Sequence, residues 1–386
     1  MRLRALPAAL STALVAGAVL IAVAPASPLL AAEVTKTLRG EISATGEFGI
    51  ENLAGTMKIV PGSGTEVVAI VTVHAESQAI ADLVKFEKVT PGGKRLKLGI
   101  CVDDDDSHPH VPTLRVRYPV DDHPTLRYPA LSGGNVITRT LSTGSSTTTT
   151  YDDHRVKVTD NRGTLLYADV EVQVPKGEVK GWFRNVVGSI TARGLQGRLE
   201  FDSGSGDIDL KDLKGTVDAD TGSGDVKIVG VEGNVNCDTG SGDCDISEVR
   251  GDRIECDLGS GDATIRASAV RSVQADTGSG DVRVIDSDIE ELDADTGSGN
   301  IELKAKGSRL ARVTADTGSG DVTLRLGADA GFEARADQGS GDLTVRYTDA
   351  QPIIRQKEVV GYRRGTARIQ IDVDTGSGDV LITPGT

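Results

Sequence analysis

The chain has 386 residues, of which 38% are hydrophobic and only 3% aromatic, and its formal net charge at pH 7 is −15. The scarcity of aromatic residues favours a narrow interior filled by aliphatic side chains. The acidic balance disfavours nucleic-acid binding, which requires a basic surface, so no nucleic acid is expected among the partners.

Residues 1–32 have the pattern of a secretory signal peptide. Arg2 and Arg4 precede an apolar run, and Ala24, Pro25 and Ala26 offer a small-residue cleavage site. An uncleaved membrane anchor is the alternative, because the run is nearly long enough to span a bilayer. We therefore expect an exported protein that is periplasmic, cell-surface or secreted and has no membrane span after signal cleavage.

Residues 33–175 are predicted to form an irregular β-rich region with acidic and Ser/Thr-rich loops. Its last segment alternates apolar and polar residues through Val170, Val172 and Val174, as in a strand with one buried face. The acidic run 103–106 and the Ser/Thr-rich segment 138–150 are typical of exposed loops. An open solenoid end exposes unpaired strand edges, so we expect this region to cap the repeats that follow.

Residues 176–386 contain nine copies of a short turn, Gly-Ser-Gly followed by Asp or once by Asn. The copies begin at Gly204, Gly222, Gly240, Gly259, Gly278, Gly297, Gly318, Gly339 and Gly376, with steps of 18 to 21 residues before a last step of 37. Aliphatic residues alternate with polar ones on both sides of each turn. We expect the glycines to supply positive φ at the bend.

A third apolar position follows each of the first six turns, at Leu213, Val231, Val249, Val270, Ile289 and Leu310. Three inward points in each period of about 20 residues predict an all-β fold, because each unit must stack on its neighbours to bury its apolar side. The fold class is therefore a parallel β-solenoid, or β-helix, with about 18–21 residues per coil. Parallel connections are nearly always right-handed, which predicts a right-handed coil.

The final 37-residue step is predicted to hold one coil without the Gly-Ser-Gly turn, in the form of a protruding loop or hairpin. It carries the only non-repeating charged cluster of the repeat region: Arg355, Lys357, Arg363, Arg364 and Arg368. We expect a partner contact there, with a cell-envelope component or surface ligand whose identity the sequence does not define.

The Asp-Thr-Gly-Ser-Gly-Asp-Val turns, which follow a Val-Pro-Lys-Gly strand end at 174–177, resemble the DUF4097 β-strand-repeat family, also labelled an adhesin family. The resemblance implies an exported bacterial envelope protein with a β-solenoid domain and no established enzymatic activity. The chain departs from the simplest family pattern in two ways: an Asp stands at the same two positions beside nearly every turn, and the chain has long acidic and Ser/Thr-rich insertions.

Two acidic columns bracket the turns, and neighbouring carboxylates near 5 Å repel by about 1 kcal/mol even in water. One hypothesis is that each Asp accepts hydrogen bonds from turn amides. The alternative is calcium, although the nonapeptide calcium motif is absent. The candidate ligands are Asp220, Asp225, Asp238, Asp243, Asp257, Asp262, Asp276 and Asp281; no other cofactor is expected.

Cys237 and Cys256 occupy equivalent positions one coil apart, at a spacing within disulfide range. Their Cβ directions should be nearly parallel, which suits a disulfide poorly, so small buried thiols are the alternative. Cys244 replaces valine in another apolar column, and Cys101 has no visible partner.

No residue pattern places a nucleophile beside a base and an orienting acid. Every coil also carries nearly the same outward residues, so a catalytic site would be repeated in each coil. The sequence therefore predicts a non-catalytic envelope protein, an adhesin or an envelope scaffold. A polysaccharide-processing enzyme is the alternative, since β-helices often carry lyases and hydrolases.

Overall fold

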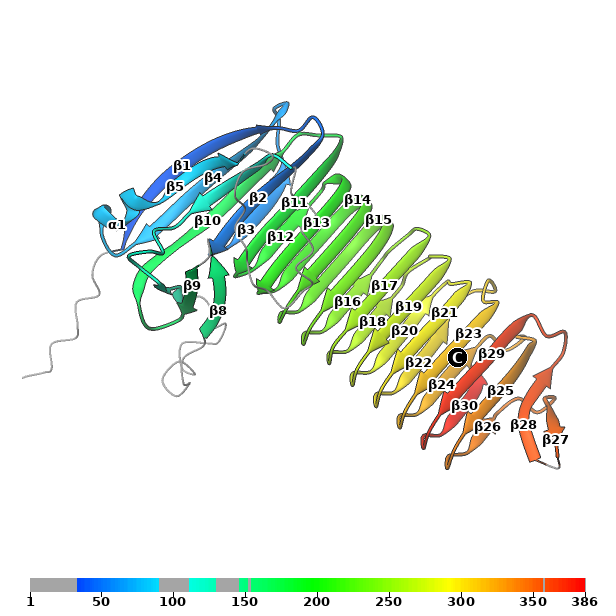
Figure 1. Cartoon of the computed structure of the whole chain (residues 1–386). Coiled ribbons are helices and arrows are strands. Elements are labelled where there is room, and N and C mark those ends of the chain that lie inside the picture. The colour runs from blue at the N-terminus through cyan, green and yellow to red at the C-terminus, as the bar shows by residue number, and fades with distance from the viewer. Residues whose placement is uncertain (1–32, 90–110, 130–145, 152–153, 357, 386) are drawn as a thin grey trace, which may run out of the picture. The chain divides into compact units, whose positions relative to one another are not determined.

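The computed structural model describes residues 33–89, 111–129, 146–151, 154–356 and 358–385, and most of these residues are in β-strands (Figure 1). Contacts group Glu33–Thr386 as one unit. The predicted signal peptide, Cys101, most of the Ser/Thr-rich segment and Lys357 lie outside the described residues. Within the described part, no helix has the length and apolar character needed to cross a bilayer.

The repeats form a parallel solenoid, as the sequence predicts. β14 (Ile208–Thr221) and β15 (Val226–Thr239) each run from one Gly-Ser-Gly turn to the next and pair in parallel from Ile208↔Val226 to Thr221↔Thr239. In the following coils each circuit divides into two strands, still parallel to those of the neighbouring coils. These strands are β16 (Cys244–Ser247), β17 (Arg253–Leu258), β18 (Ala263–Arg266), β19 (Ser272–Thr277), β20 (Val282–Ser287), β21 (Glu291–Thr296), β22 (Ile301–Ala305), β23 (Arg312–Thr317) and β24 (Val322–Leu326).

The narrow aliphatic interior is also confirmed. In the coil of β15, Val226, Ile228 and Val231 are at most 1% exposed, and Val235 is 2% exposed. Each such side chain contributes roughly 1.5–3 kcal/mol when fully buried, and only the stacking of neighbouring coils closes the interior around it. The handedness of the coil stays a prediction.

The solenoid begins earlier in the chain than the predicted boundary at 176. β2 (Glu47–Ala54) pairs in parallel with β11 (Glu178–Val187), and β3 (Met57–Pro61) pairs in parallel with β12 (Ile190–Arg193). Residues 47–61 therefore form a coil that stacks directly on the first coil after the N-terminal region. Sequence periodicity does not reveal this coil because more than 100 residues separate it from its neighbour.

The N-terminal region covers this first end of the stack, as predicted (Figure 1). β4 (Glu66–Ala75) pairs antiparallel with β1 (Val34–Ser43) and β10 (Thr164–Val174), and β10 pairs in parallel with β3. The remaining elements of the first half are α1 (Gln78–Leu83), β5 (Lys85–Val89), β6 (Thr113–Arg117), β7 (Thr125–Arg127), β8 (Ser146–Tyr151), β9 (His154–Thr159) and β13 (Gln196–Ser205).

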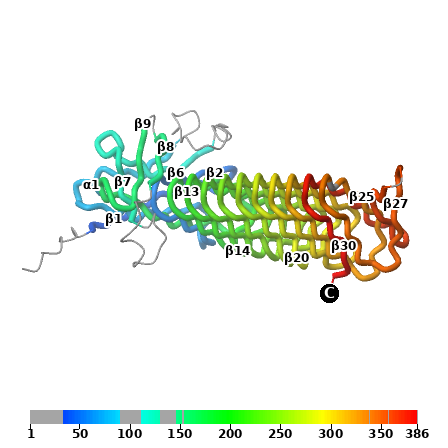
Figure 2. The backbone as a smooth tube through the Cα atoms, turned by 90° about the horizontal axis from the view of Figure 1, so that it is seen from below, coloured from blue at the N-terminus to red at the C-terminus, as the bar shows by residue number. Residues whose placement is uncertain are grey.

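The last coil in the sequence is not the last coil in the stack. β29 (Ile369–Thr375) lies between β23 and β25 (Phe332–Gln338), and β30 (Val380–Pro384) lies between β24 and β26 (Leu343–Val345). Figures 1 and 2 show the red C-terminal strands inserted before the orange ones. The 37-residue step adds no further coil to the stack. In it, β27 (Gln351–Arg355) and β28 (Glu358–Arg364) form an antiparallel hairpin, which is one of the two forms, loop or hairpin, predicted from the sequence.

Candidate functional site: the aspartate columns and the C-terminal hairpin

The acidic residue that follows each turn links one coil to the next. The side chain of Asp207 accepts a hydrogen bond of 3.1 Å from the backbone amide of Asp225, whose own side chain accepts one from Asp243. The same contact recurs at 2.7–2.9 Å through Asp262, Asp281, Asn300, Asp321, Asp379 and Asp342. The predicted amide capping is thus present, but the donor belongs to the neighbouring coil.

A threonine precedes most of the Gly-Ser-Gly turns and provides a second link between coils, a role that the sequence did not predict. The Thr277 hydroxyl donates to the Gly261 carbonyl of the preceding coil at 2.9 Å and accepts from the Gly280 amide at 3.2 Å. Equivalent pairs of bonds are made by Thr239, Thr296, Thr317 and Thr375. The repeated Asp-Thr pair before the turns is the sequence feature from which this bonding role could have been predicted.

The turn glycines are required by close packing rather than by positive φ, which corrects the expectation from the sequence. None of the Gly-Ser-Gly glycines has φ in the left-handed range. A Cβ added at Gly261 would lie 1.8 Å from the Gly242 carbonyl oxygen, and one at Gly280 would lie 1.9 Å from the Gly261 oxygen. Since no side chain fits, the turns stack at backbone contact distance.

The acidic residue that precedes each turn points outward and is stacked on its equivalents in the neighbouring coils. Asp202, Asp220 and Asp238 are in register on β13, β14 and β15. Burial, together with the neighbouring Asp202 and Asp238 carboxylates, raises the pKa of Asp220 to about 7. The pKa of Asp295 is raised for the same reasons, with Asp276 and Asp316 as its neighbours.

The two aspartate columns do not form a calcium-coordinating cluster among the described residues. In the described ranges, no group of three or more His, Cys, Asp or Glu side chains is placed to hold a metal ion. The candidates after the turn (Asp225, Asp243, Asp262 and Asp281) each use a carboxylate oxygen as an acceptor for a backbone amide. The candidates before the turn (Asp220, Asp238, Asp257 and Asp276) form one stacked column. Calcium binding stays an alternative hypothesis.

Of the two alternatives for Cys237 and Cys256, the disulfide between them is wrong: Cys237 is bonded to Cys244, and Cys256 is a free buried thiol. Cys237 and Cys244 flank the same turn, and their Cα atoms are 7.0 Å apart. Cys256 is in register with Cys237 on the adjacent strand, where side chains run parallel instead of toward one another. Burial raises the pKa of the Cys256 thiol to about 12.

Two arginines of the predicted partner contact are engaged within the protein. Arg363 forms an ion pair with Glu333. Arg364 pairs with Asp349 at 2.6 Å, and its guanidinium lies 4.6 Å from the centre of the Tyr347 ring. These contacts hold the hairpin against β25 and the adjoining loop.

Arg355 and Arg368 remain for the partner contact. Arg355 lines an open hollow of about 570 Å³ beneath the hairpin, where Asp316, Asp337 and Asp374 also lie. Arg368 is exposed, and its backbone amide donates to the Gly331 carbonyl. The partner contact itself stays a prediction.

Comparisons with known proteins identify a family. The model of the Toastrack DUF4097 family matches residues 144–383. A search of curated proteins finds no match.

Two solved structures also resemble the chain. One is described as "Putative lipid binding protein" from Parabacteroides distasonis ATCC 8503, with 13% identity, coverage of 90% of this chain and 96% of its own, and a TM-score of 0.41. The other is described as "putative cell adhesion protein" from Clostridium sporogenes ATCC 15579, with 10% identity, coverage of 91% and 100%, and a TM-score of 0.18.

Proposed function

Because the chain belongs to the Toastrack DUF4097 family, we propose that it is an exported, non-catalytic cell-envelope protein whose β-solenoid serves as an adhesin or envelope scaffold. The observation that carries the proposal is the repetition of the outward Asp column. Asp residues remain in register from Asp202 on β13 to Asp337 on β25. A surface that repeats coil by coil suits an extended ligand better than a single small substrate.

The polar groups of the turns support a structural role for the repeat. Their carboxylates and hydroxyls are used in bonds between coils, as Asp225 and Thr239 illustrate. These groups stabilise the stack and leave the outward column as the repeated surface for a partner. A polysaccharide-processing enzyme is the alternative, and release of sugars from envelope polysaccharide by the purified protein would favour it.

Cell fractionation combined with protease shaving tests the proposed location. The full chain with a C-terminal tag should be found outside the cytoplasm and should be cleaved by protease added to intact cells if it acts as an adhesin. The matched control lacks residues 5–24 and should stay in the cytoplasm. A full chain that fractionates with the control would refute export. An exported chain that added protease does not cleave in intact cells would exclude the adhesin role and favour the scaffold role.

Charge reversal at the hairpin tests the partner contact. Arg355→Glu combined with Arg368→Glu should deplete envelope components that the native protein captures. Arg309→Glu, at an exposed site elsewhere in the solenoid, is the control and should capture the native set. If the double variant also captures the native set, the hairpin is not the contact.

A further inference from the structure

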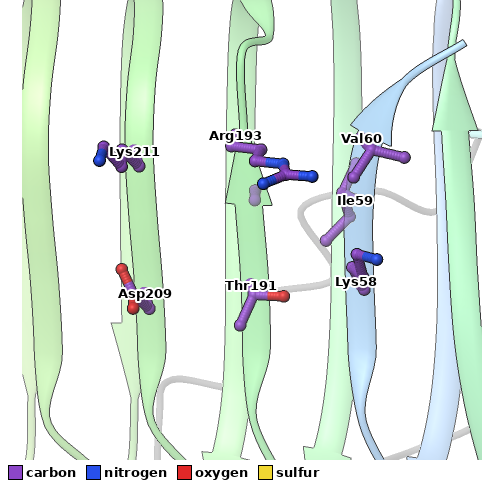
Figure 3. A pocket seen from close by; sticks show the side chains of 8 residues that line it. Lys58, Ile59, Val60, Thr191, Arg193, Asp209 and Lys211 are labelled. Carbon is purple, nitrogen blue, oxygen red and sulfur yellow. The ribbon is translucent and has the colours of Figure 1, made fainter.

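We propose that the outer face of β3, β12 and β14 binds a ligand that carries phosphate groups. A hollow of about 200 Å³ lies over these neighbouring strands, and its lining includes Lys58, Arg193 and Lys211 (Figure 3). Arg193 extends toward β3 in this view. This site goes beyond the proposed function, because it does not depend on the aspartate column or on the hairpin.

Strand register brings the basic side chains together from distant parts of the chain. Thr191 is paired with Lys58 on one side and with Asp209 on the other, and Arg193 is paired with Lys211. Asp209 is in turn paired with Lys227, which is exposed on β15 next to the hollow. The patch therefore combines Lys58, Arg193, Lys211 and Lys227.

The positive charges of this patch are less neutralised than others on the same face. Among the described residues, no acidic group lies within ion-pair distance of Arg193, Lys211 or Lys227. Lys58 has only a long contact of 3.7 Å to Glu171, with both side chains about half exposed. Asp209 is the one acidic residue in the lining.

Basic residues further along the face are instead paired within the protein. Arg266 bonds to Asp245 at 2.5 Å, and Lys304 bonds to Asp286 at 2.9 Å. Arg283 and Arg325 likewise contact Asp262 and Glu302. Among the described residues of this face, the weakly paired cations thus lie together on β3, β12, β14 and β15, although the chain as a whole carries a net charge of −15.

The side chains fit phosphate in particular. A guanidinium offers a planar pair of donors to two phosphate oxygens, and lysines add point charges around them. Adjacent strands are about 4.8 Å apart, so β3 and β14 are roughly 10 Å apart across β12. Lys58 and Lys211 are further separated by an offset of two residues along the strands. This span favours a ligand with several phosphates, from either a soluble polymer or a surface of lipid headgroups.

Binding of the purified full chain to two probes tests the site. The first probe is long-chain inorganic polyphosphate, and the second is a vesicle of phosphatidylglycerol, with phosphatidylcholine vesicles as the neutral reference. We expect the double variant Arg193→Gln with Lys211→Gln to bind at least one probe roughly tenfold more weakly and with a shallower salt dependence. The probe that responds identifies the source of the phosphate.

The matched control is Arg266→Gln with Lys304→Gln, which removes the same charge from the same face at paired positions. It should bind like the native protein, and circular dichroism should show all three proteins folded. An equal loss in both double variants would indicate nonspecific attraction to net charge and would overturn the proposal. Absence of native binding to either probe, or no loss in the first variant, would overturn it as well.

Discussion

The carboxylate of Asp220 lies in register between those of Asp202 and Asp238, and the like charges crowd one outer face of the solenoid. Partial burial and these two neighbours raise the pKa of Asp220 to about 7, from about 3.9 in an unfolded chain. Below pH 4 both states are protonated. As the pH rises from 4 to 7, the unfolded chain loses this proton first, so ionisation progressively destabilises the folded state.

Asp220→Asn should therefore stabilise the protein at pH 8 by about 1 kcal/mol, allowing for solvent screening of a partly exposed group. The gain should shrink toward zero as the pH falls to 4. Urea denaturation at a series of pH values measures it, with Thr216→Asn on the same strand as the control. A gain that is the same at pH 4 and pH 8 would contradict the electrostatic explanation.

Ala267→Gly should stabilise the solenoid. The second corner of the coil has left-handed backbone at equivalent positions, and Ala267 has φ 48° there. A residue with a Cβ costs roughly 1 kcal/mol in this conformation, whereas glycine does not. Thermal denaturation should show a higher Tm, and the same substitution at Ala269, which forms extended bridges with Arg250 and Asp288, should lower it. Equal decreases would exclude strain at Ala267.

Thr277→Val should destabilise the protein by about 1–3 kcal/mol. The change preserves shape but leaves the Gly261 carbonyl and the Gly280 amide without their hydroxyl partner at a buried position. The outward-facing Thr264→Val is the control, and its effect should stay within about 0.5 kcal/mol. Similar denaturation midpoints for the two variants would show that the hydroxyl link contributes little.

The melting temperature should be the same in calcium and in a chelator. Turn carboxylates such as those of Asp225 and Asp243 already accept backbone amides, which favours capping over metal coordination. Magnesium serves as the control for nonspecific screening by a divalent cation. A Tm that rises by several degrees in calcium but not in magnesium would support the calcium alternative.

The stacking order at the C-terminal end can be tested by crosslinking. Thr314 is in register with Asp372 in the adjacent strand, whereas a stack in sequence order would place Thr314 beside Arg335. In a Cys101→Ser background, a thiol crosslinker spanning about 5 Å should join Thr314→Cys to Asp372→Cys. It should not join Thr314→Cys to Arg335→Cys, and the reverse result would contradict the inserted coil.

The coil geometry could be predicted because its determinants recur within a short window. Apolar columns such as Val226 and Ile228 define the inner face, and repeated turns define the period. The left-handed corner could not be predicted, since its residues share no chemistry: Asp212, Gly230, Glu248, Ala267, Asp286 and Gly307. Its conformation is imposed by coil closure and not by local preference.

The candidate sites were less predictable because they depend on the direction of side chains and on the pairing of strands that are far apart in the sequence. The column position of Cys237 and Cys256 gives their spacing, but the bond to Cys244 depends on side-chain direction across a turn. Lys58 and Arg193 line the same hollow only because β3 stacks beside β12, a pairing that local periodicity does not reveal. The inserted coil has the same origin, since β25 and β29 carry equivalent repeat residues.

That equivalence has a consequence for how the chain completes its fold during synthesis. Residues 332–345 leave the ribosome before residues 369–384, and they carry side chains that match β23 and β24 in register. The native arrangement separates them by the last coil, while β28 pairs with β25 from the other side. The repeats therefore define how coils stack but not their order, and the order of the final two is specified by the hairpin that connects them.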